Sequence, residues 1–389
     1  MIKRLFSLAL SFILLLTASG CASILEGETS VIVPYIDNNA AKTDSGDETI
    51  TVSTYDEFKS SVKQMVKEYS DSAAFRITEF DREDLENSLN QACQEIALED
   101  PLGSYAVYYI SCDVTPIVTY YDVKVSIVFK HTQEEIQNIV SVYSERYLQY
   151  SLLSSMQAFE EHCTFHTTID TITSEFITST VEKQYYQSPL TIIVLPTVDI
   201  STYPSGEGDR ITDVSFSYGY SSSVLSSMAS RLDSAASEIA EHVEGYDDHS
   251  LLLGLCEDLA SLVEYRPHST SVLNDTAYSA LVQKEASSAG IAMAYKALCD
   301  KMGLACKVVK GSHLGEEHFW NIVTLSGFSY HVDITEYLSG NVFLKGDDFM
   351  RGDYWWDTGT VPVCPTDYDY ISSGDAGATV GQEDTVTLP

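Results

Sequence analysis

Apolar side chains recur at helical spacing in two segments of the chain that lie 90 residues apart. Residues three or four apart fall on one face of a helix, so each stripe predicts an amphipathic helix. The first stripe consists of Phe58, Val62, Val66 and Tyr69, and the second of Leu148, Leu152, Met156 and Phe159.

Strand patterns follow both predicted helices. Short strands are expected around 75–78 and 165–168, and each segment ends in a strand in which apolar and polar residues alternate. Alternation with one apolar face predicts a half-buried antiparallel sheet that the helices cover. The pattern therefore predicts two tandem α+β modules, residues 51–132 and 133–222, which lack clustered His, Cys or paired carboxylates and are expected to be spacer or recognition modules. The alternating residues are Val123, Val125, Ile127 and Phe129 in the first module, and Val214, Phe216, Tyr218 and Tyr220 in the second.

Helical periodicity continues in the last part of the chain. A helix is expected over 224–243, and Leu252, Leu255, Leu259 and Leu262 form the stripe of the next one. Asn274-Asp-Thr276 is expected to cap a short helix that runs through Tyr278 and Leu281.

The first 21 residues have the pattern of a secretory signal. Lys3 and Arg4 precede the apolar run 5–16, and small residues follow. Cys21, directly after Ala18-Ser-Gly20, resembles the lipidation site of bacterial lipoproteins, which implies cleavage before Cys21, lipid on its thiol and anchoring to the outer face of the bacterial cell membrane. A plain signal peptide that is cleaved elsewhere is the alternative. Residues 22–50 are expected to form a flexible linker, and residues 372–389 a disordered tail.

The chain is strongly acidic. Its 22 Lys and Arg face 57 Asp and Glu, and cleavage of the signal would leave 20 basic residues and a formal charge of −37. Such a body repels phosphate polymers, so nucleic acid is not expected as a partner. Besides Cys21 there are seven cysteines, without a Cys-x-x-Cys pair, so neither a disulfide framework nor a zinc site is predicted. Cys306 and Cys364 are the pair considered for a single bridge.

Three motifs in order resemble the core of transglutaminase-like domains, which belong to the papain-like superfamily. They are the segment from Ser287-Ser-Ala-Gly290 to Leu304, then His318-Phe-Trp-Asn321, then His331-Val-Asp-Ile-Thr335. The resemblance covers roughly residues 245–370. It implies an α+β fold in residues 223–371, in which a helix packs on an antiparallel sheet.

The same resemblance assigns the site. It places Ser288 where the family has its nucleophilic cysteine, His318 at the base and Asp333 at the residue that orients the base, and it implies that Trp320 and Asn321 contribute to binding. If the register slips by one residue, Ser287 takes the place of Ser288. A helix N-cap is the purely structural alternative for Ser288, since serine is favoured there. No metal and no cofactor is expected, because the loop with His313, Glu316 and Glu317 has no recognised ligand spacing.

A hydroxyl in place of the thiol leads to three functional hypotheses. The first is a catalytically degenerate transglutaminase-like domain that binds peptide, protein or cell-wall material. The second is an active acyl-transfer or peptide-hydrolysing enzyme that uses Ser288, His318 and Asp333. The third is a spacer or adhesin in which the tyrosine-rich modules bind.

Overall fold

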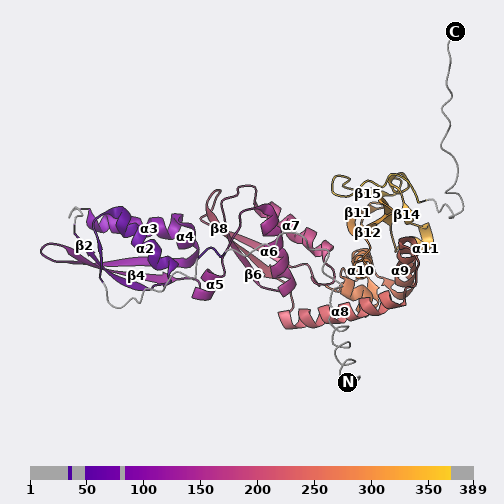
Figure 1. Cartoon of the computed structure of the whole chain (residues 1–389), viewed down its shortest axis with the longest axis horizontal. Coiled ribbons are helices and arrows are strands. Elements are labelled where there is room, and N and C mark those ends of the chain that lie inside the picture. The colour runs from indigo at the N-terminus through magenta and orange to yellow at the C-terminus, as the bar shows by residue number, and fades with distance from the viewer. Residues whose placement is uncertain (1–33, 37–48, 79–83, 369–389) are drawn as a thin grey trace, which may run out of the picture. The chain divides into compact units, whose positions relative to one another are not determined.

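The computed structural model describes residues 34–36, 49–78 and 84–368 (Figure 1). These residues form two compact units. One unit runs to Tyr147 and includes Phe165–Thr167, and the other comprises Leu148–Thr164 and the chain from Thr168 onward. The predicted signal peptide with Cys21, most of the predicted linker and the predicted tail 372–389 lie outside the described residues.

Part of the predicted linker belongs to the fold, namely residues 34–36 and Ile50, the first residue of a strand. The Tyr35 N–H donates to the Ile139 carbonyl (2.9 Å), and the side chain of Ile36 is buried. Residues 34–36 are therefore held in place, which the polar composition of the segment around them did not predict.

The first sheet has the strand order β1-β2-β4-β3, in which β1 and β2 are parallel and the other neighbours antiparallel. In β4, Val123, Val125 and Ile127 are buried and Lys124 is exposed, so the alternation was correctly interpreted. Helices α2, α3 and α4 cover one face (Figure 1). The elements are β1 (Ile50–Val52), α2 (Tyr55–Lys67), β2 (Ser72–Ile77), α3 (Leu85–Glu99), α4 (Pro101–Ala106), β3 (Val107–Pro116) and β4 (Tyr121–Phe129).

A second four-stranded sheet has the order β5-β6-β8-β7, with β5 and β6 again parallel and β7 and β8 antiparallel. Helix α7, which the apolar pattern did not predict, begins at Ser174, where the Thr173 hydroxyl accepts from the Phe176 N–H (3.1 Å). The elements are α5 (Gln133–Gln137), β5 (Val140–Ser141), α6 (Glu145–Ala158), β6 (His162–Thr167), α7 (Ser174–Gln187), β7 (Thr197–Tyr203) and β8 (Arg210–Ser217).

The two sheets repeat each other in detail. Ile50 is paired with Phe75 in the first, and Val140 with Phe165 in the second, an offset of 90 residues at both positions. Helices α2 and α6 both end before an aromatic residue in the left-handed conformation, Tyr69 (φ 57°) and Phe159 (φ 54°). These two residues, expected as the last positions of the helical stripes, instead terminate the helices.

The next segment contains the helices α8 (Ser222–His242) and α9 (Asp248–Leu262) where the periodicity predicted them. A short π-helix, η1 (Ser279–Gln283), follows in place of the expected short α-helix. Its first N–H is bound by the Thr276 hydroxyl (3.1 Å), whereas the Asn274 side-chain amide donates to the Arg266 carbonyl (2.9 Å). The parallel strands β9 (Glu264–Tyr265) and β10 (Glu285–Ala286) close this segment onto helix α10.

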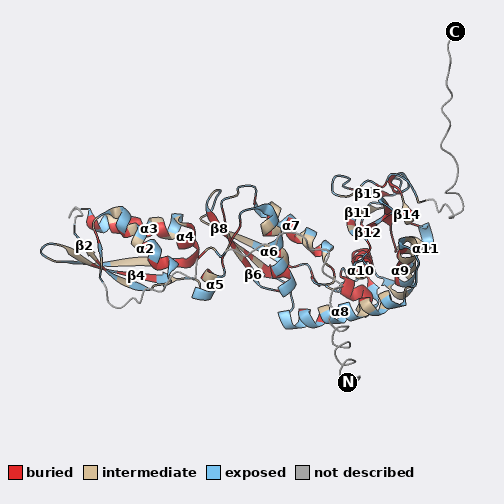
Figure 2. Ribbon diagram, in the orientation of Figure 1, coloured by how far each residue is buried: buried red, intermediate tan, exposed pale blue. Residues whose placement is uncertain are grey.

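The last sheet is antiparallel, five-stranded and ordered β14-β13-β12-β11-β15. Helix α10 packs against β11 and β12 and is buried from Ser288 to Cys299 (Figure 2). The α+β class and the helix on an antiparallel sheet are thus confirmed. Among the described residues no helix is both long and apolar enough to cross a membrane. The elements are α10 (Ser288–Lys301), β11 (Cys306–His313), β12 (Glu316–Leu325), β13 (Phe328–Val332), α11 (Tyr337–Gly340), β14 (Phe343–Lys345), α12 (Asp347–Met350) and β15 (Tyr354–Trp356).

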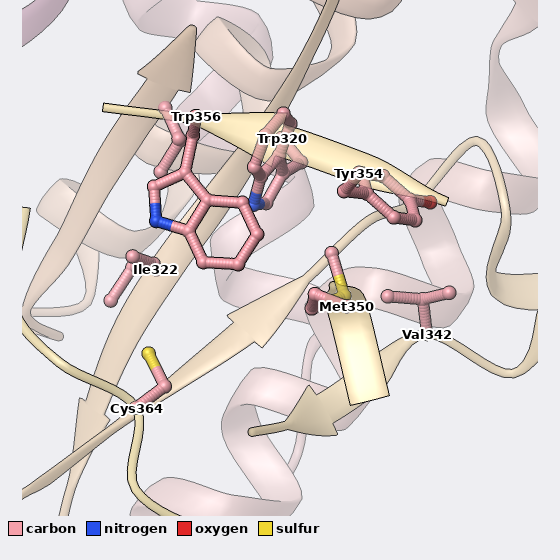
Figure 3. Packing of buried hydrophobic residues seen from close by; sticks show 8 residues of the cluster. Trp320, Ile322, Val342, Met350, Tyr354, Trp356 and Cys364 are labelled. Atoms are coloured by element: carbon pink, nitrogen blue, oxygen red, sulfur yellow. The ribbon is translucent and has the colours of Figure 1, made fainter. Parts of the chain in front are cut away.

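Strand β12 is buried on both faces. Successive side chains point to opposite faces, and each face packs against a different part of the core. Phe319 packs on Ala289 and Ala292 of α10. Trp320 and Ile322 point into a cluster on the other face with Val309, Val342, Met350, Tyr354, Trp356 and Cys364 (Figure 3).

Candidate functional site

Helix α10 starts with a complete side-chain cap. Ser287 is the N-cap: its hydroxyl accepts from the Gly290 N–H (3.4 Å) and donates to the Asp275 carboxylate (2.5 Å). Ser288 is the first helical residue, so the N-cap alternative for Ser288 is wrong. Gly290 permits close packing here, since a Cβ would lie 2.6 Å from the Asn274 carbonyl oxygen.

The hydroxyl of Ser288 is held by the sheet. Strand β13 pairs with β12 from Asn321 onward, so the Phe319 N–H has no partner in that ladder. It donates instead to the Ser288 Oγ (3.3 Å), and Ser288 is only 6% exposed. In the described part of the chain no hydrogen bond joins Ser288 to His318. The Phe319 N–H and the Tyr265 side chain, which also forms a hydrogen bond with Ser288, therefore position the hydroxyl.

His318 and Asp333 form the buried pair that the motifs predicted. Nε2 of His318 lies 2.7 Å from Asp333 Oδ2. A carboxylate can only accept, so Nε2 carries the proton, and Nδ1 is the nitrogen left to act on a ligand. The structure thus brings the two side chains into direct hydrogen-bond contact.

Asp333 is saturated with hydrogen bonds. Its Oδ1 accepts from the N–H (3.0 Å) and the hydroxyl (2.6 Å) of Thr335, and its Oδ2 accepts from the Tyr354 hydroxyl (2.8 Å). Burial acts to raise the pKa of Asp333, but the hydrogen bond and charge of His318, with Thr335 and Tyr354, outweigh it and lower the pKa. Thr335 is the last residue of the third motif, where it had no assigned role.

A pocket of about 840 Å³ opens over Ser288 and His318. Residues from far apart in the sequence line it, including Tyr186 of α7, Leu195, Tyr218, Tyr265 of β9 and Phe319. The pocket has the size and mixed lining of small-molecule and peptide sites. Sequence reasoning missed the residues before 223, because only the fold brings them to this site.

Helix α7 is attached to the pocket by three specific contacts. The Tyr185 hydroxyl donates to the Asp275 carbonyl (3.2 Å), and Glu182 forms an ion pair with Lys310 (3.2 Å). The rings of Tyr186 and Phe319 are 5.7 Å apart, within the range of favourable aromatic pairs. Tyr186 therefore forms one wall beside the residue whose N–H binds Ser288.

Acidic groups dominate the charge around this pocket. Asp275, Glu316, Glu317 and Glu336 line it, against Lys310 as the one lysine or arginine in the lining. Burial, with Asp333, Glu336 and Glu316 nearby, raises the pKa of Tyr265, so its phenol stays protonated as a donor at neutral pH. The lining therefore favours neutral or cationic ligands.

Trp320 and Asn321, predicted as binding residues, do not line the pocket. Trp320 is 1% exposed and lies in the cluster of Figure 3. The Asn321 amide donates to the Ala292 carbonyl of α10 (2.9 Å). In this structure the two residues hold β12 between the helix and the opposite core, which fixes where His318 lies.

A second buried hydrogen-bond relay joins Trp320, His331 and Asp347. The Trp320 indole N–H donates to Nδ1 of His331 (2.9 Å), and Nε2 of His331 lies 2.9 Å from Asp347. Ligand atoms of His331, Asp347 and Cys364 lie within 4.8 Å of one another, as in metal sites. Both ring nitrogens of His331 are already hydrogen-bonded, however, so this set is a structural relay.

We predict that this relay makes the fold sensitive to mild acid. Burial lowers the pKa of His331 below its usual value of 6.5 despite Asp347. An unfolded chain then binds the proton more readily, so stability is complete above the unfolded pKa and falls as the pH drops below it. Urea unfolding at pH 7 and pH 5 should show the loss, and His331→Gln should flatten it. An equally steep loss in His331→Gln would contradict the prediction.

Comparisons with known proteins give distant likenesses. No family model and no curated protein matches the chain. A solved structure described as a TGase aligns over 55% of this chain and 63% of its own, with 12% identity and a TM-score of 0.27. A candidate cysteine protease from Cytophaga hutchinsonii aligns over 36% and 62%, with 14% identity and a TM-score of 0.24.

A candidate protease from Parabacteroides distasonis aligns over 67% of this chain and 40% of its own, with 7% identity and a TM-score of 0.21. The chain spans less than two thirds of each of these three structures. At these identities and TM-scores the likenesses assign neither a family nor an activity.

Proposed function

We propose that residues 223–371 form a transglutaminase-like domain that binds a peptide or amide without turning it over. The observation that carries this proposal is the state of the Ser288 hydroxyl, which accepts from the Phe319 N–H and makes no hydrogen bond to His318 in the described part of the chain. A nucleophile needs in addition its own proton directed at the base.

The chemistry of oxygen supports the same proposal. A thiol ionises near pH 8.5, and a helix N-terminus with an imidazolium can lower that pKa by several units. A serine hydroxyl is a far weaker acid, so it must lose its proton to an aligned base during attack. In the described part of the chain, Nδ1 of His318 does not form the hydrogen bond to Ser288 through which that transfer would run.

The ligand class that we propose is peptide, protein or cell-wall material. The imidazole, the Ser288 hydroxyl and the Tyr265 phenol are polar groups in an aromatic pocket, and an extended amide offers both donors and acceptors to them. The acidic lining favours chains with amines nearby and disfavours anionic polymers. The proposed binding therefore does not extend to nucleic acid.

Replacement of Tyr186 should weaken this binding. Tyr186→Ala removes a ring that forms a pocket wall and packs on Phe319, so affinity for a bound peptide should fall about 10-fold or more. Calorimetric titration with glutamine-containing peptides and soluble peptidoglycan fragments measures the change. Tyr246→Ala is the control, because Tyr246 is fully exposed and not in the lining. Equal losses in the two variants would contradict a specific pocket.

A second candidate function is acyl transfer or peptide hydrolysis by Ser288, His318 and Asp333. The 2.7 Å contact of His318 and Asp333 favours it, since that pair orients a base beside the N-terminus of α10. A fluorophosphonate probe separates the two functions. Labelling of Ser288 that disappears in His318→Ala would support the enzyme, and an unlabelled protein that still binds peptide would support the binding module.

For location, we propose an exported lipoprotein anchored through Cys21 to the outer face of the bacterial cell membrane. The support is the sequence of residues 1–21 and the acidity of the rest of the chain. Labelled palmitate should enter the intact protein in bacterial cells and not the Cys21→Ala variant. Label retained in that variant would refute the anchor.

We also propose that residues 51–132 and 133–222 act as two modules that carry the binding domain away from the membrane, and that the second also supplies Tyr186 to the wall of the pocket. Their common strand order and their 90-residue offset support this division. If the modules themselves bind, as an adhesin would, peptide binding should survive deletion of residues 245–389.

A further inference from the structure

Two cysteines lie in contact where a helix packs on the first sheet. Cys93 lies on α3 and Cys112 on β3, and their sulfur atoms are 3.4 Å apart. We propose that Cys93 and Cys112 form a disulfide bond by exchange with a small-molecule or protein disulfide, which locks α3 onto β3. This inference concerns residues remote from the proposed binding site and does not depend on it.

The geometry requires little movement. A disulfide has its sulfurs about 2.05 Å apart, so closure needs a shift of roughly 1.4 Å shared between two side chains. The elements that carry them already pack together, since α3 lies against β3. The fold therefore holds the two thiols in contact before any bond forms.

The pair is open to a reagent on one side. Cys93 is 5% exposed, whereas Cys112 is partly exposed. Cys112 also lines a cavity of about 260 Å³ with Glu86, Leu89, Asn90 and Val114. A small-molecule disulfide that enters this cavity can therefore react with Cys112, whereas Cys93 is too buried to react with it first.

The electronic arrangement gives the two sulfurs different roles. The hydrogen bond between the thiols lowers the pKa of Cys112 and raises that of Cys93, so Cys112 is the sulfur that ionises first. Its thiolate attacks the external disulfide, forming a mixed disulfide and releasing one thiol. The Cys93 thiol then loses its proton and displaces the second thiol, so two protein thiols are oxidised and one external disulfide is reduced.

A second close pair of thiols provides a contrast. Cys299 is fully buried, and Cys306, which interacts with it, is 8% exposed and accepts from the Asn321 amide (3.4 Å). Burial raises the pKa of Cys299 well above its usual value. The same exchange is therefore blocked there by access and by ionisation.

Mass spectrometry of the full chain tests the proposal. Protein incubated with oxidised glutathione is alkylated and digested with trypsin, which leaves both cysteines in one peptide because no Lys or Arg lies between Arg82 and Lys124. Glu-C then cuts after Glu95 and Glu99, between the two cysteines. We expect the two Glu-C fragments to stay joined until a reductant is added, with two hydrogens fewer than the reduced pair.

Variants decide whether the bond is specific. Cys93→Ser should stop at a stable glutathione adduct on Cys112, and Cys112→Ser should leave Cys93 free. Cys299→Ser is the matched control and should still form the bond. Oxidation should raise the melting temperature of the first unit by about 10 °C in the unmodified chain and not in Cys93→Ser. Recovery of alkylated Cys93 and Cys112 as separate fragments after oxidation would overturn the proposal.

Discussion

Ser288→Cys should place a reactive thiol at the N-terminus of α10. The new sulfur would lie at the first residue of α10, next to the Phe319 N–H and in the same pocket as His318. The helix N-terminus and the imidazole lower a thiol pKa, so at pH 6 it should react with iodoacetamide on the order of 100-fold faster than an ordinary thiol. Release of ammonia or amine from glutamine-containing peptides should appear with it.

Two control variants show whether the pocket causes that reactivity. Ser287→Cys places the same thiol one residue earlier, at the N-cap and beside the Asp275 carboxylate. The negative charge of Asp275 opposes ionisation of this thiol, so it should react far more slowly than Ser288→Cys. His318→Ala in the Ser288→Cys background should also slow the reaction. If Ser287→Cys and Ser288→Cys react alike, the assignment of Ser288 to the nucleophile position is wrong.

Asp333→Ala should be among the most destabilising single substitutions in the chain. Asp333 is 1% exposed and accepts from His318, Thr335 and Tyr354. Removal of one partner of a buried ionic pair costs about 3–5 kcal/mol, because the remaining groups are left buried without a partner. Urea unfolding followed by tryptophan fluorescence measures the loss.

The pH dependence of the free energy of unfolding checks whether the charge of Asp333 is the cause. The pKa of Asp333 is lowered in the folded protein, so its contribution is present above the unfolded value of about 3.9 and is lost as the pH falls through the folded value. Stability should therefore drop below pH 4 in the unmodified chain and less steeply in Asp333→Asn. Asp348→Ala is the control, since this carboxylate is 90% exposed. A similar loss in Asp348→Ala would contradict the account.

The apolar periodicity of the sequence predicted several helices and strands, but not how they pack against one another. The stripes at Phe58 and Leu148, the alternation in β4 and the helix that became α8 all have one buried face, which leaves a repeating signal. Helices α3 and α7 were not predicted, although their buried residues also lie at helical spacing. Small or polar residues occupy part of each stripe, Ala92 and Cys93 in α3 and Thr180 in α7, so the apolar signal is weaker and tertiary packing decides these segments.

The sequence motifs predicted one contact of the candidate site, that between His318 and Asp333. His318 and Asp333 meet at 2.7 Å as the motif order implied. The wall that Tyr186 provides could not be foreseen, since it lies more than 100 residues before Ser288 in the sequence and reaches the pocket only through the packing of α7. The assignment of Trp320 and Asn321 to binding came from the resemblance, whereas β12 is buried on both faces, so Trp320 points into one core and Asn321 toward α10 on the other face.

The most direct test of the central claim is amide release from glutamine-containing peptides by the unmodified chain, measured beside Ser288→Ala and Ser288→Cys. The account predicts the same background rate for the unmodified chain and Ser288→Ala, with release only in Ser288→Cys. Turnover by the unmodified chain that disappears in Ser288→Ala would contradict it and would make Ser288 a working nucleophile.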